Sequence, residues 1–205
     1  MFMTIYAAVL FASLAMMVRE GLWSNAISLV CILISGLVAF GFYSPLVIYL
    51  DEMLDGEFTY LLDFVTIWGL FVISMLICRL FTGMASRTRM RFKNPIDPVG
   101  GPLIGLIAAW TLAAFAMATL HTSPMPKDAF GGSLVYSDDD VESSSALFNP
   151  DLGWLRFVER VTRPDGFGHS SGAGGFSAKA FVQIYADHRD KYQQAKPAWI
   201  AVRRS

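Results

Sequence analysis

Residues 99–120 read VGGPLIGLIAAWTLAAFAMATL, a run without one charged side chain. About 20 apolar helical residues are enough to cross a bilayer core, so this run has the length and composition of a transmembrane helix. Three further apolar runs precede it, over residues 2–18, 22–45 and 61–81. The sequence therefore predicts an all-α integral membrane protein with a domain of four transmembrane helices over residues 1–120.

The composition divides the chain into two regions. Charged residues make up 16% of the whole chain, against about 25% in an average soluble domain, and the apolar excess lies before residue 121. Residues 121–150 are acidic and contain Gly and Ser, which predicts a solvated linker. Residues 151–205 follow as a small helical tail outside the membrane.

Two segments of this tail have the apolar spacing of short helices: Asp151 to Val161, and Ser177 to Gln194 with Ser177 as its N-cap. Two short helices cannot build a large core of their own. We expect them to pack on each other or to lie on the membrane surface, with Trp154 and Phe157 as anchors.

Basic residues near span ends predict the orientation, because Lys and Arg mark the cytoplasmic side. The loop before the fourth run is strongly basic, the loop after the first run has Arg19, and residues 51–60 have no basic residue. Both termini are therefore expected to face outward. The topology anchors are Arg79, Arg87, Arg89, Arg91 and Lys93. Because this basic segment directly adjoins a span and the net charge is −1, we expect contact with the lipid bilayer and no nucleic-acid partner.

Small residues recur every fourth position in the fourth run, at Gly101, Gly105, Ala109 and Ala113. Such a face lets two helix backbones approach closely, which is how helices associate in lipid. We predict a packing contact there. Its partner is either another helix of the same chain or another protein, as in a homo-oligomer or a complex with a second membrane protein.

Asp97 directly precedes Pro98 at the start of the fourth run. An Asp followed by a Pro is typical of an N-cap and first helical position. The alternative is that Asp97 binds a proton or an ion. Its place at the edge of the run favours the cap.

Ionisable side chains are scarce deep inside the four runs. Asp63 and Arg79 lie near the ends of the third run, where a charge can reach the headgroups, and Asn25 is near one end of the second. Ion-coupled transporters usually need buried charges or broken helices. This pattern therefore lowers the expectation of a secondary transporter.

Cysteines and histidines give no pattern of a metal or cofactor site. Cys31 and Cys78 both lie inside apolar runs, and His121, His169 and His188 are widely spaced. We therefore expect no metal and no other cofactor.

One segment matches a catalytic motif. Gly168-His169-Ser170-Ser171-Gly172 has the G-x-S-x-G spacing of a hydrolase nucleophile elbow. That motif needs a strand before the Ser, and no strand is expected here. We interpret the segment as a flexible hinge and predict that the protein is not an enzyme.

Three segments resemble the colicin V production protein (CvpA) family. They are the turn Val18-Arg19-Glu20-Gly21-Leu22-Trp23, the span that follows it through Gly36 and Ala39, and Ile96-Asp97-Pro98-Val99-Gly100-Gly101 with Gly105. The resemblance covers about residues 3–120. The chain departs from it at Glu20, where the family often has more basic residues, and at Pro98 and Pro102, which flank the glycines.

The resemblance implies a multi-pass protein of the bacterial inner membrane, linked to toxin production or export and to envelope maintenance, with no established catalytic site. The leading hypothesis is therefore a non-enzymatic scaffold or export accessory. A small channel or secondary transporter is the alternative. A third hypothesis is a membrane-anchored interaction module whose tail is the active part, and the sequence alone does not separate the three.

Overall fold

The computed structural model describes residues 2–18, 20–54, 59–85, 96–125, 129–134, 136, 149–163 and 176–194. Across these ranges every regular element is helical, as predicted. The elements are α1 (Phe2–Met17), α2 (Leu22–Met53), α3 (Thr59–Ala85), α4 (Ile96–Thr119), η1 (Leu120–Thr122), η2 (Ala129–Gly132), α6 (Pro150–Thr162) and α7 (Ala178–Gln194).

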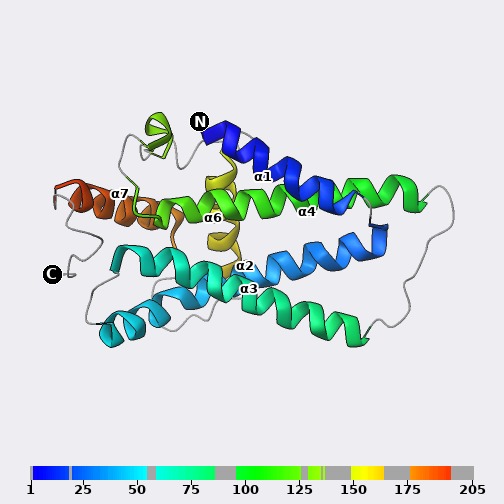
Figure 1. Ribbon diagram of the computed structural model, residues 1–205, viewed down its shortest axis with the longest axis horizontal. Coiled ribbons are helices and arrows are strands. Elements are labelled where there is room, and N and C mark those ends of the chain that lie inside the picture. Colours follow the sequence, from blue (N-terminus) through cyan, green and yellow to red (C-terminus); the bar gives the residue numbers. More distant parts are fainter. Residues whose placement is uncertain are drawn as a thin grey trace.

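Helices α1 to α4 form a bundle in which successive helices run in opposite directions (Figure 1). Helix α2 packs against both α3 and α4, and α1 packs against α4. The α1–α2 turn and the start of α4 therefore lie at one end of the bundle, and the end of α4 lies at the other.

The surface of this bundle is apolar in the way that lipid requires. Large apolar side chains are more than half exposed on all four helices, and examples are Phe11, Phe42, Leu80 and Val99. A helix that is hydrophobic on all sides belongs in a membrane or a large core, and here these side chains point out of the protein. The chain is therefore a multi-pass membrane protein.

Among the described residues, three helices are long and apolar enough to cross a membrane: Leu22–Met53, Leu61–Met84 and Asp97–Thr122. Helix α1 has 16 residues, which is about 24 Å at 1.5 Å per residue and short of a bilayer core of about 30 Å. The predicted span over residues 2–18, and with it the count of four spans, is not confirmed and stays a prediction. Helix α2 is longer than its predicted span, because it continues through Pro45 to Met53.

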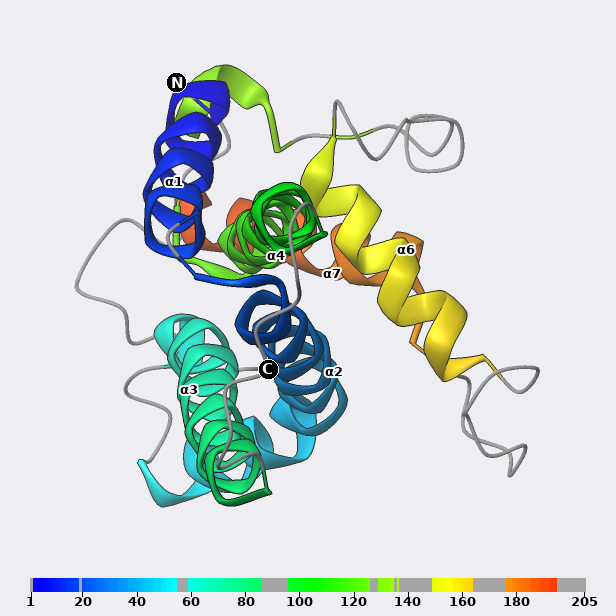
Figure 2. The same cartoon turned by 90° about the vertical axis from the view of Figure 1, so that its right-hand side faces the viewer.

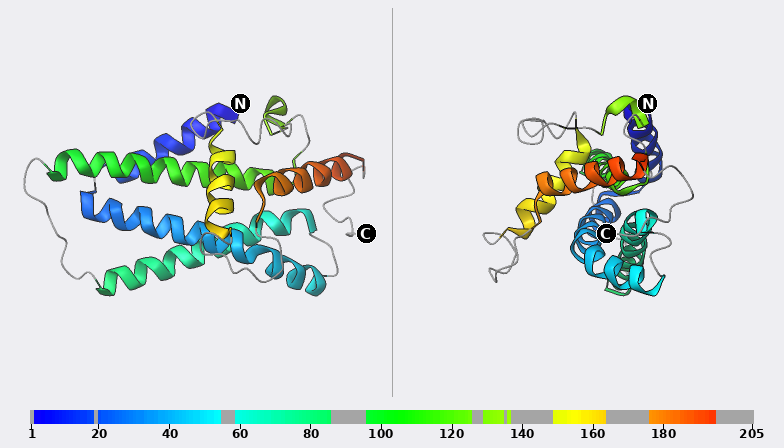
Figure 3. Two further views of the ribbon diagram at one scale, coloured as in Figure 1. Left: turned by 180° about the vertical axis from the view of Figure 1, so that it is seen from behind. Right: turned by 90° about the vertical axis from the view of Figure 1, so that its left-hand side faces the viewer.

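The two C-terminal helices pack on the bundle. Helix α6 crosses α4 and α2 steeply, on the side of the bundle away from α1 and α3 (Figures 1 and 2), and buries Leu152, Trp154, Leu155 and Val158. Helix α7 packs on α6 and η1 (Figure 3). The predicted N-cap of α7 is confirmed, since the Ala180 N–H donates to Ser177 Oγ at 3.3 Å.

Two expectations about the tail were wrong in detail. Trp154 is not a membrane anchor, because it is only 3% exposed and lies in the protein core. The start of the predicted solvated linker is packed as well, since Leu134 is buried against Phe2 and Met117. The acidic run 137–148 lies outside the described residues.

Candidate functional site

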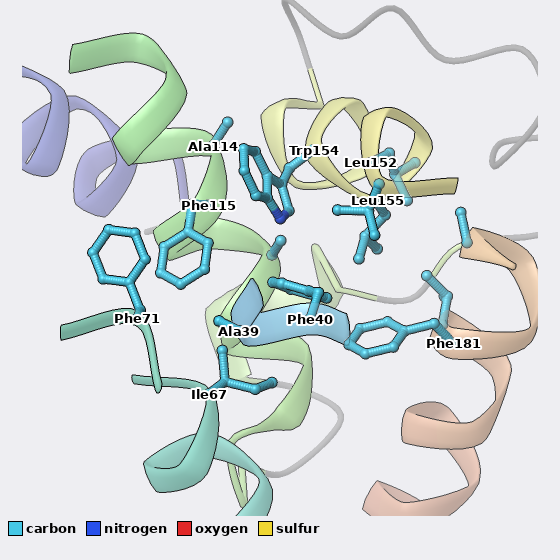
Figure 4. Close-up of a cluster of buried hydrophobic side chains, with 14 of the residues drawn as sticks. Ala39, Phe40, Ile67, Phe71, Ala114, Phe115, Leu152, Trp154, Leu155 and Phe181 are labelled. Carbon is cyan, nitrogen blue, oxygen red and sulfur yellow. The ribbon is translucent and has the colours of Figure 1, made fainter. Parts of the chain in front are cut away.

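Aromatic rings fill the centre of the bundle where α6 crosses it (Figure 4). Phe115 of α4 stacks on Phe71 with ring centroids 4.3 Å apart. Trp68 and Trp154 each lie 5.5 Å from Phe115, and Phe40 lies 5.9 Å from it. Four helices therefore meet in one aromatic core.

Gly36 of α2 makes room for the indole of Trp154. A Cβ atom at position 36 would lie 2.4 Å and 2.6 Å from two carbons of that ring. Real Cβ atoms do not approach so closely, so the absence of a side chain at Gly36 is what admits α6 to the core.

Gly101 and Gly105, the first two of the four small residues of α4, face the chain's own α1–α2 region. A Cβ atom on Gly101 would lie 3.3 Å from both the Glu20 carbonyl oxygen and the Leu22 nitrogen. Ala109 and Ala113 are fully buried on the same helix. This face is thus occupied within one copy of the chain.

Asn25 fastens the α1–α2 turn to α4. Its side-chain nitrogen donates to the Gly101 carbonyl at 2.8 Å and the Met17 carbonyl at 3.0 Å, with a longer contact of 3.3 Å to the Glu20 carbonyl. The residue is completely buried, so these bonds form without competition from water. Asn25 therefore holds three chain segments together, and we infer a structural role for it.

Asp97 caps a different helix from the one expected. The sequence predicts that it precedes α4 and caps it, but it is the second residue of α4. Its Oδ1 accepts a hydrogen bond of 2.9 Å from the N–H of Leu22, the first residue of α2. Gly21, the N-cap residue of α2, has no side chain to satisfy that group, so a carboxylate from another helix does so.

Replacing Asp97 by Ala should lower stability by about 1 kcal/mol, the usual effect of losing a cap. Asp97→Asn should behave nearly as wild type, because the amide oxygen still accepts from Leu22. Thermal unfolding of the purified proteins in detergent measures both. An Asp97→Asn protein that is as stable as wild type but does not restore function in a deletion strain would contradict the cap and favour the ion-site alternative.

Of the predicted topology anchors, Arg79 is described. Its Nη2 donates to Ser28 Oγ of α2 at 3.0 Å, so it also links two helices. Arg19, Arg87, Arg89, Arg91 and Lys93 lie outside the described residues.

A second polar cluster forms at the opposite end of the bundle, around Asp63 and Tyr185. The sequence predicts that Asp63 reaches the headgroups, but it is only 3% exposed and lies near Tyr185 of α7. Burial raises the pKa of Tyr185 far above its ordinary value, and the neighbouring Tyr43 and Asp63 raise it further. The phenol therefore stays protonated at neutral pH.

His121 and Asp151 form the best-defined pair of this cluster. His121 Nε2 and Asp151 Oδ2 lie 2.8 Å apart, and both side chains are 0% exposed. His121 Nδ1 and Asp151 Oδ1 are buried without a hydrogen-bond partner. One contact thus joins η1, which directly follows α4, to the first turn of α6, and the other polar atom of each side chain has no hydrogen-bond partner.

Removing one member of this pair should lower the stability by more than the loss of one hydrogen bond, because the other member is left buried without a partner. A buried polar group left alone carries its desolvation penalty, about 1–3 kcal/mol. We expect His121→Ala and Asp151→Ala each to lower stability by about 2 kcal/mol, and the double variant to lower it by less than the sum of the two. Thermal unfolding of the three variants measures the coupling, and strict additivity would contradict a direct interaction.

A small cavity lies beside the pair, with room for about one water molecule. Its walls include Asp63, His121, Tyr185, His188 and Arg189. The structure therefore brings together two of the histidines that are widely spaced in sequence, while His169 lies outside the described residues. No group of three metal-ligating side chains occurs in the part of the chain that the structure describes.

Arg189 is the most unusual member of the wall, since it is a buried cation. It donates to the Leu134 carbonyl at 3.1 Å, while its Nε and Nη1 have no hydrogen-bond partner. Burial lowers its pKa below the ordinary arginine value, and the charge of Asp190 raises it in part. A buried charge with so few hydrogen-bond partners lowers the stability of the folded protein.

Sequence reasoning missed this outer cluster because its members come from distant parts of the chain. Asp63 and Tyr185 are separated by more than a hundred residues, and no spacing rule joins them. One signal was present, since Asp63 interrupts an otherwise apolar run. Residues 168–172, which match the nucleophile-elbow spacing and are predicted to be a hinge, lie outside the described residues.

Comparison with known families supplies an identity for the bundle. The family described as Colicin V production protein matches residues 4–138. Searches of curated proteins and of solved structures found no match. The matched range covers nearly all of α1 and the whole of α2 to α4, and it ends before α6 and α7. Because it covers more than half of the sequence, the chain belongs to the colicin V production protein family.

Proposed function

We propose that the protein is a non-enzymatic scaffold or accessory of the bacterial inner membrane, acting in toxin production and export or in envelope maintenance. One observation carries the proposal. The centre of the bundle is filled by the rings of Phe40, Phe71, Phe115 and Trp154. A chain packed in this way is suited to holding a fixed shape in the membrane.

The test is genetic complementation. In a toxin-producing bacterium that lacks the protein, we expect less toxin in the medium or a more permeable envelope, and wild-type protein should restore both. Normal export and an intact envelope in the deletion strain would contradict the proposal.

The outer polar cluster favours a second candidate, a proton- or ion-coupled transporter. Carboxylates buried near the membrane boundary are expensive and often functional. Asp63 beside Tyr185, and Asp151 beside His121, are of this kind.

Asp63→Asn separates the two candidates, because it keeps the shape and removes the ionisable group. A scaffold should still complement the deletion strain when this variant folds and accumulates normally. A coupled transporter should be inactive with Asn at position 63 although it folds. Tyr185→Phe keeps the ring and removes the hydroxyl, so it tests the Tyr185 side of the contact with Asp63 in the same way.

We also propose that both termini face the periplasm, in line with the basic residues between α3 and α4. Reporter fusions at Glu57 and Ser205 should then score as outward, and a fusion at Arg89 as inward. A cytoplasmic score at Ser205 would overturn this orientation.

A further inference from the structure

We propose that α6 is an interfacial helix that binds anionic phospholipid headgroups through Arg156, Arg160 and Arg163, here called the basic stripe. The structure has α6 lying across the spanning helices and not along them (Figures 1 and 3). An amphipathic helix that lies in the plane of a membrane surface has this orientation. The proposal does not depend on the export role, and three separate observations support it.

The first observation is the division of α6 into two faces. Trp154, Leu155 and Val158 are buried against the bundle. The basic stripe has spacings of four and three residues, which place its members one above another on the opposite face. Arg160 is exposed, and the side chain of Arg163 is 61% exposed although it pairs with Glu159 at 3.2 Å. Arg156 is half-buried, so the exposed part of the stripe is Arg160 and Arg163. The exposed part of this face of α6 is therefore basic.

The second observation is the depth of α6. Leu22 and Gly101 are in contact at the end of the bundle that holds the α1–α2 turn, so they lie at one level. Gly36 and Phe115 are both in contact with Trp154 of α6 and lie at a second level. Fourteen residues separate the two levels on α2 and also on α4. This is a distance of about 21 Å at 1.5 Å per residue.

This depth agrees with the outer boundary of a bilayer. Asp97 and Glu20 mark a polar edge close to the first level. A hydrocarbon core of about 30 Å measured from there would end about 9 Å beyond the level of Trp154. Amphipathic interfacial helices bury their apolar face by about 5–10 Å. Helix α6 therefore lies at the depth where such a helix is stable.

The third observation is the direction of the two edges of α6. Glu159 Oε2 accepts from the Ala178 N–H at 3.4 Å, so its edge faces α7, which lies beyond α6 toward the end of α4 in Figure 1. Phe157 is two residues away, which is a rotation of about 200° on a helical wheel. Its ring therefore lies on the edge of α6 opposite Glu159, where it is half-buried with its centroid 5.5 Å from that of Trp154. The edge of α6 toward α7 is thus acidic and the opposite edge is aromatic.

Anionic phospholipid is the ligand that fits the basic stripe of α6. Arginine binds phosphate groups through its planar guanidinium, and basic side chains near a membrane surface attract anionic headgroups. Helix α7 provides the control. Lys191 is also exposed and basic, but it lies near the end of α7, away from the proposed headgroup layer.

A depth measurement tests the position of α6. A nitroxide is attached at Arg160→Cys or at Lys191→Cys in full-length protein whose Cys31 and Cys78 are replaced by Ser, in lipid nanodiscs. We expect the label at position 160 to collide with dissolved oxygen more, and with a water-soluble nickel chelate less, than the label at position 191. Equal exposure of both labels to the nickel chelate would overturn the proposal.

A lipid measurement tests the basic stripe. The midpoint of thermal unfolding is compared in nanodiscs of phosphatidylcholine with and without phosphatidylglycerol. Phosphatidylglycerol should raise the midpoint of wild type. Arg160→Gln should weaken this response, with about fivefold lower affinity per arginine removed, and Arg156→Gln with Arg163→Gln should weaken it further.

Lys191→Gln should leave the lipid response unchanged. A response that survives neutralisation of the whole stripe would contradict lipid binding at α6. A response equally weakened by Lys191→Gln would show a general charge effect and would also overturn the proposal. Complementation in the deletion strain tests the scaffold role separately, so failure of one proposal does not decide the other.

Discussion

Gly36→Leu should destabilise the protein by about 3–5 kcal/mol, whereas Gly41→Leu on the same helix should not. A Cβ at position 36 would lie 2.4 Å from the ring of Trp154, while a Cβ at position 41 meets nothing within 4 Å. The leucine should therefore expel Trp154 and with it α6. The expected loss matches that of removing a buried tryptophan. At position 41 the change replaces a helical glycine by a better helix former, which favours stability.

Thermal unfolding in detergent and proteolysis of the folded protein measure this difference. The Gly36→Leu variant should be cleaved faster within residues 149–163, because α6 would no longer be packed. Trp154→Ala should be destabilised by a similar amount, and adding Gly36→Leu to it should cost little more, since the clashing ring is gone. Fully additive losses would mean that Gly36 and Trp154 do not depend on each other.

Gly105→Leu should lower stability by roughly 3–5 kcal/mol, through overpacking and through lost hydrogen bonds. A Cβ at position 105 would lie 2.9 Å from the side-chain nitrogen of Asn25 and 3.5 Å from Met17 Cβ. A leucine there would push the α1–α2 turn away from α4. Asn25 would then lose the Gly101 carbonyl, and buried polar groups would be left without partners.

Gly69→Leu is the matched control for this change. Position 69 is also a helical glycine, but nothing lies within 4 Å of a Cβ there. We expect the Gly69→Leu protein to accumulate in the membrane like wild type and the Gly105→Leu protein to accumulate poorly or unfold at a lower temperature. Leu106→Ala, next to Gly105 but exposed, should have a smaller effect. Similar behaviour of Gly105→Leu and Gly69→Leu would contradict a close-packed glycine face.

Hydropathy predicted most of the bundle, because crossing lipid imposes a local rule. Every backbone polar group must be satisfied within its own helix, so about 20 apolar residues in a row already specify a spanning element. The runs at residues 61–81 and 99–120 lie almost entirely within α3 and α4 for this reason. The small face of α4 was also visible, since spacing in sequence fixes which residues share a side of a helix.

The structure was needed for the partners of those helices. Asp97 has the sequence of a cap, but nothing local says that the N–H it accepts belongs to Leu22, seventy-five residues away. Trp154 has the sequence of an interfacial anchor, and only the space above Gly36 turns it into a core residue. Such choices depend on shape complementarity between distant surfaces, which periodicity does not encode.

By itself, the sequence determined that this is an all-α membrane protein, which of its segments are apolar and which side of α4 is small. The tertiary structure decided what those segments enclose. It brought Asp63, His121, Asp151 and Tyr185 to one end of the bundle and laid α6 across the spans. The physical reason is that the composition of each segment alone decides whether it is stable as a helix in lipid. Buried polar pairs and close contacts, in contrast, exist only once several helices have packed together.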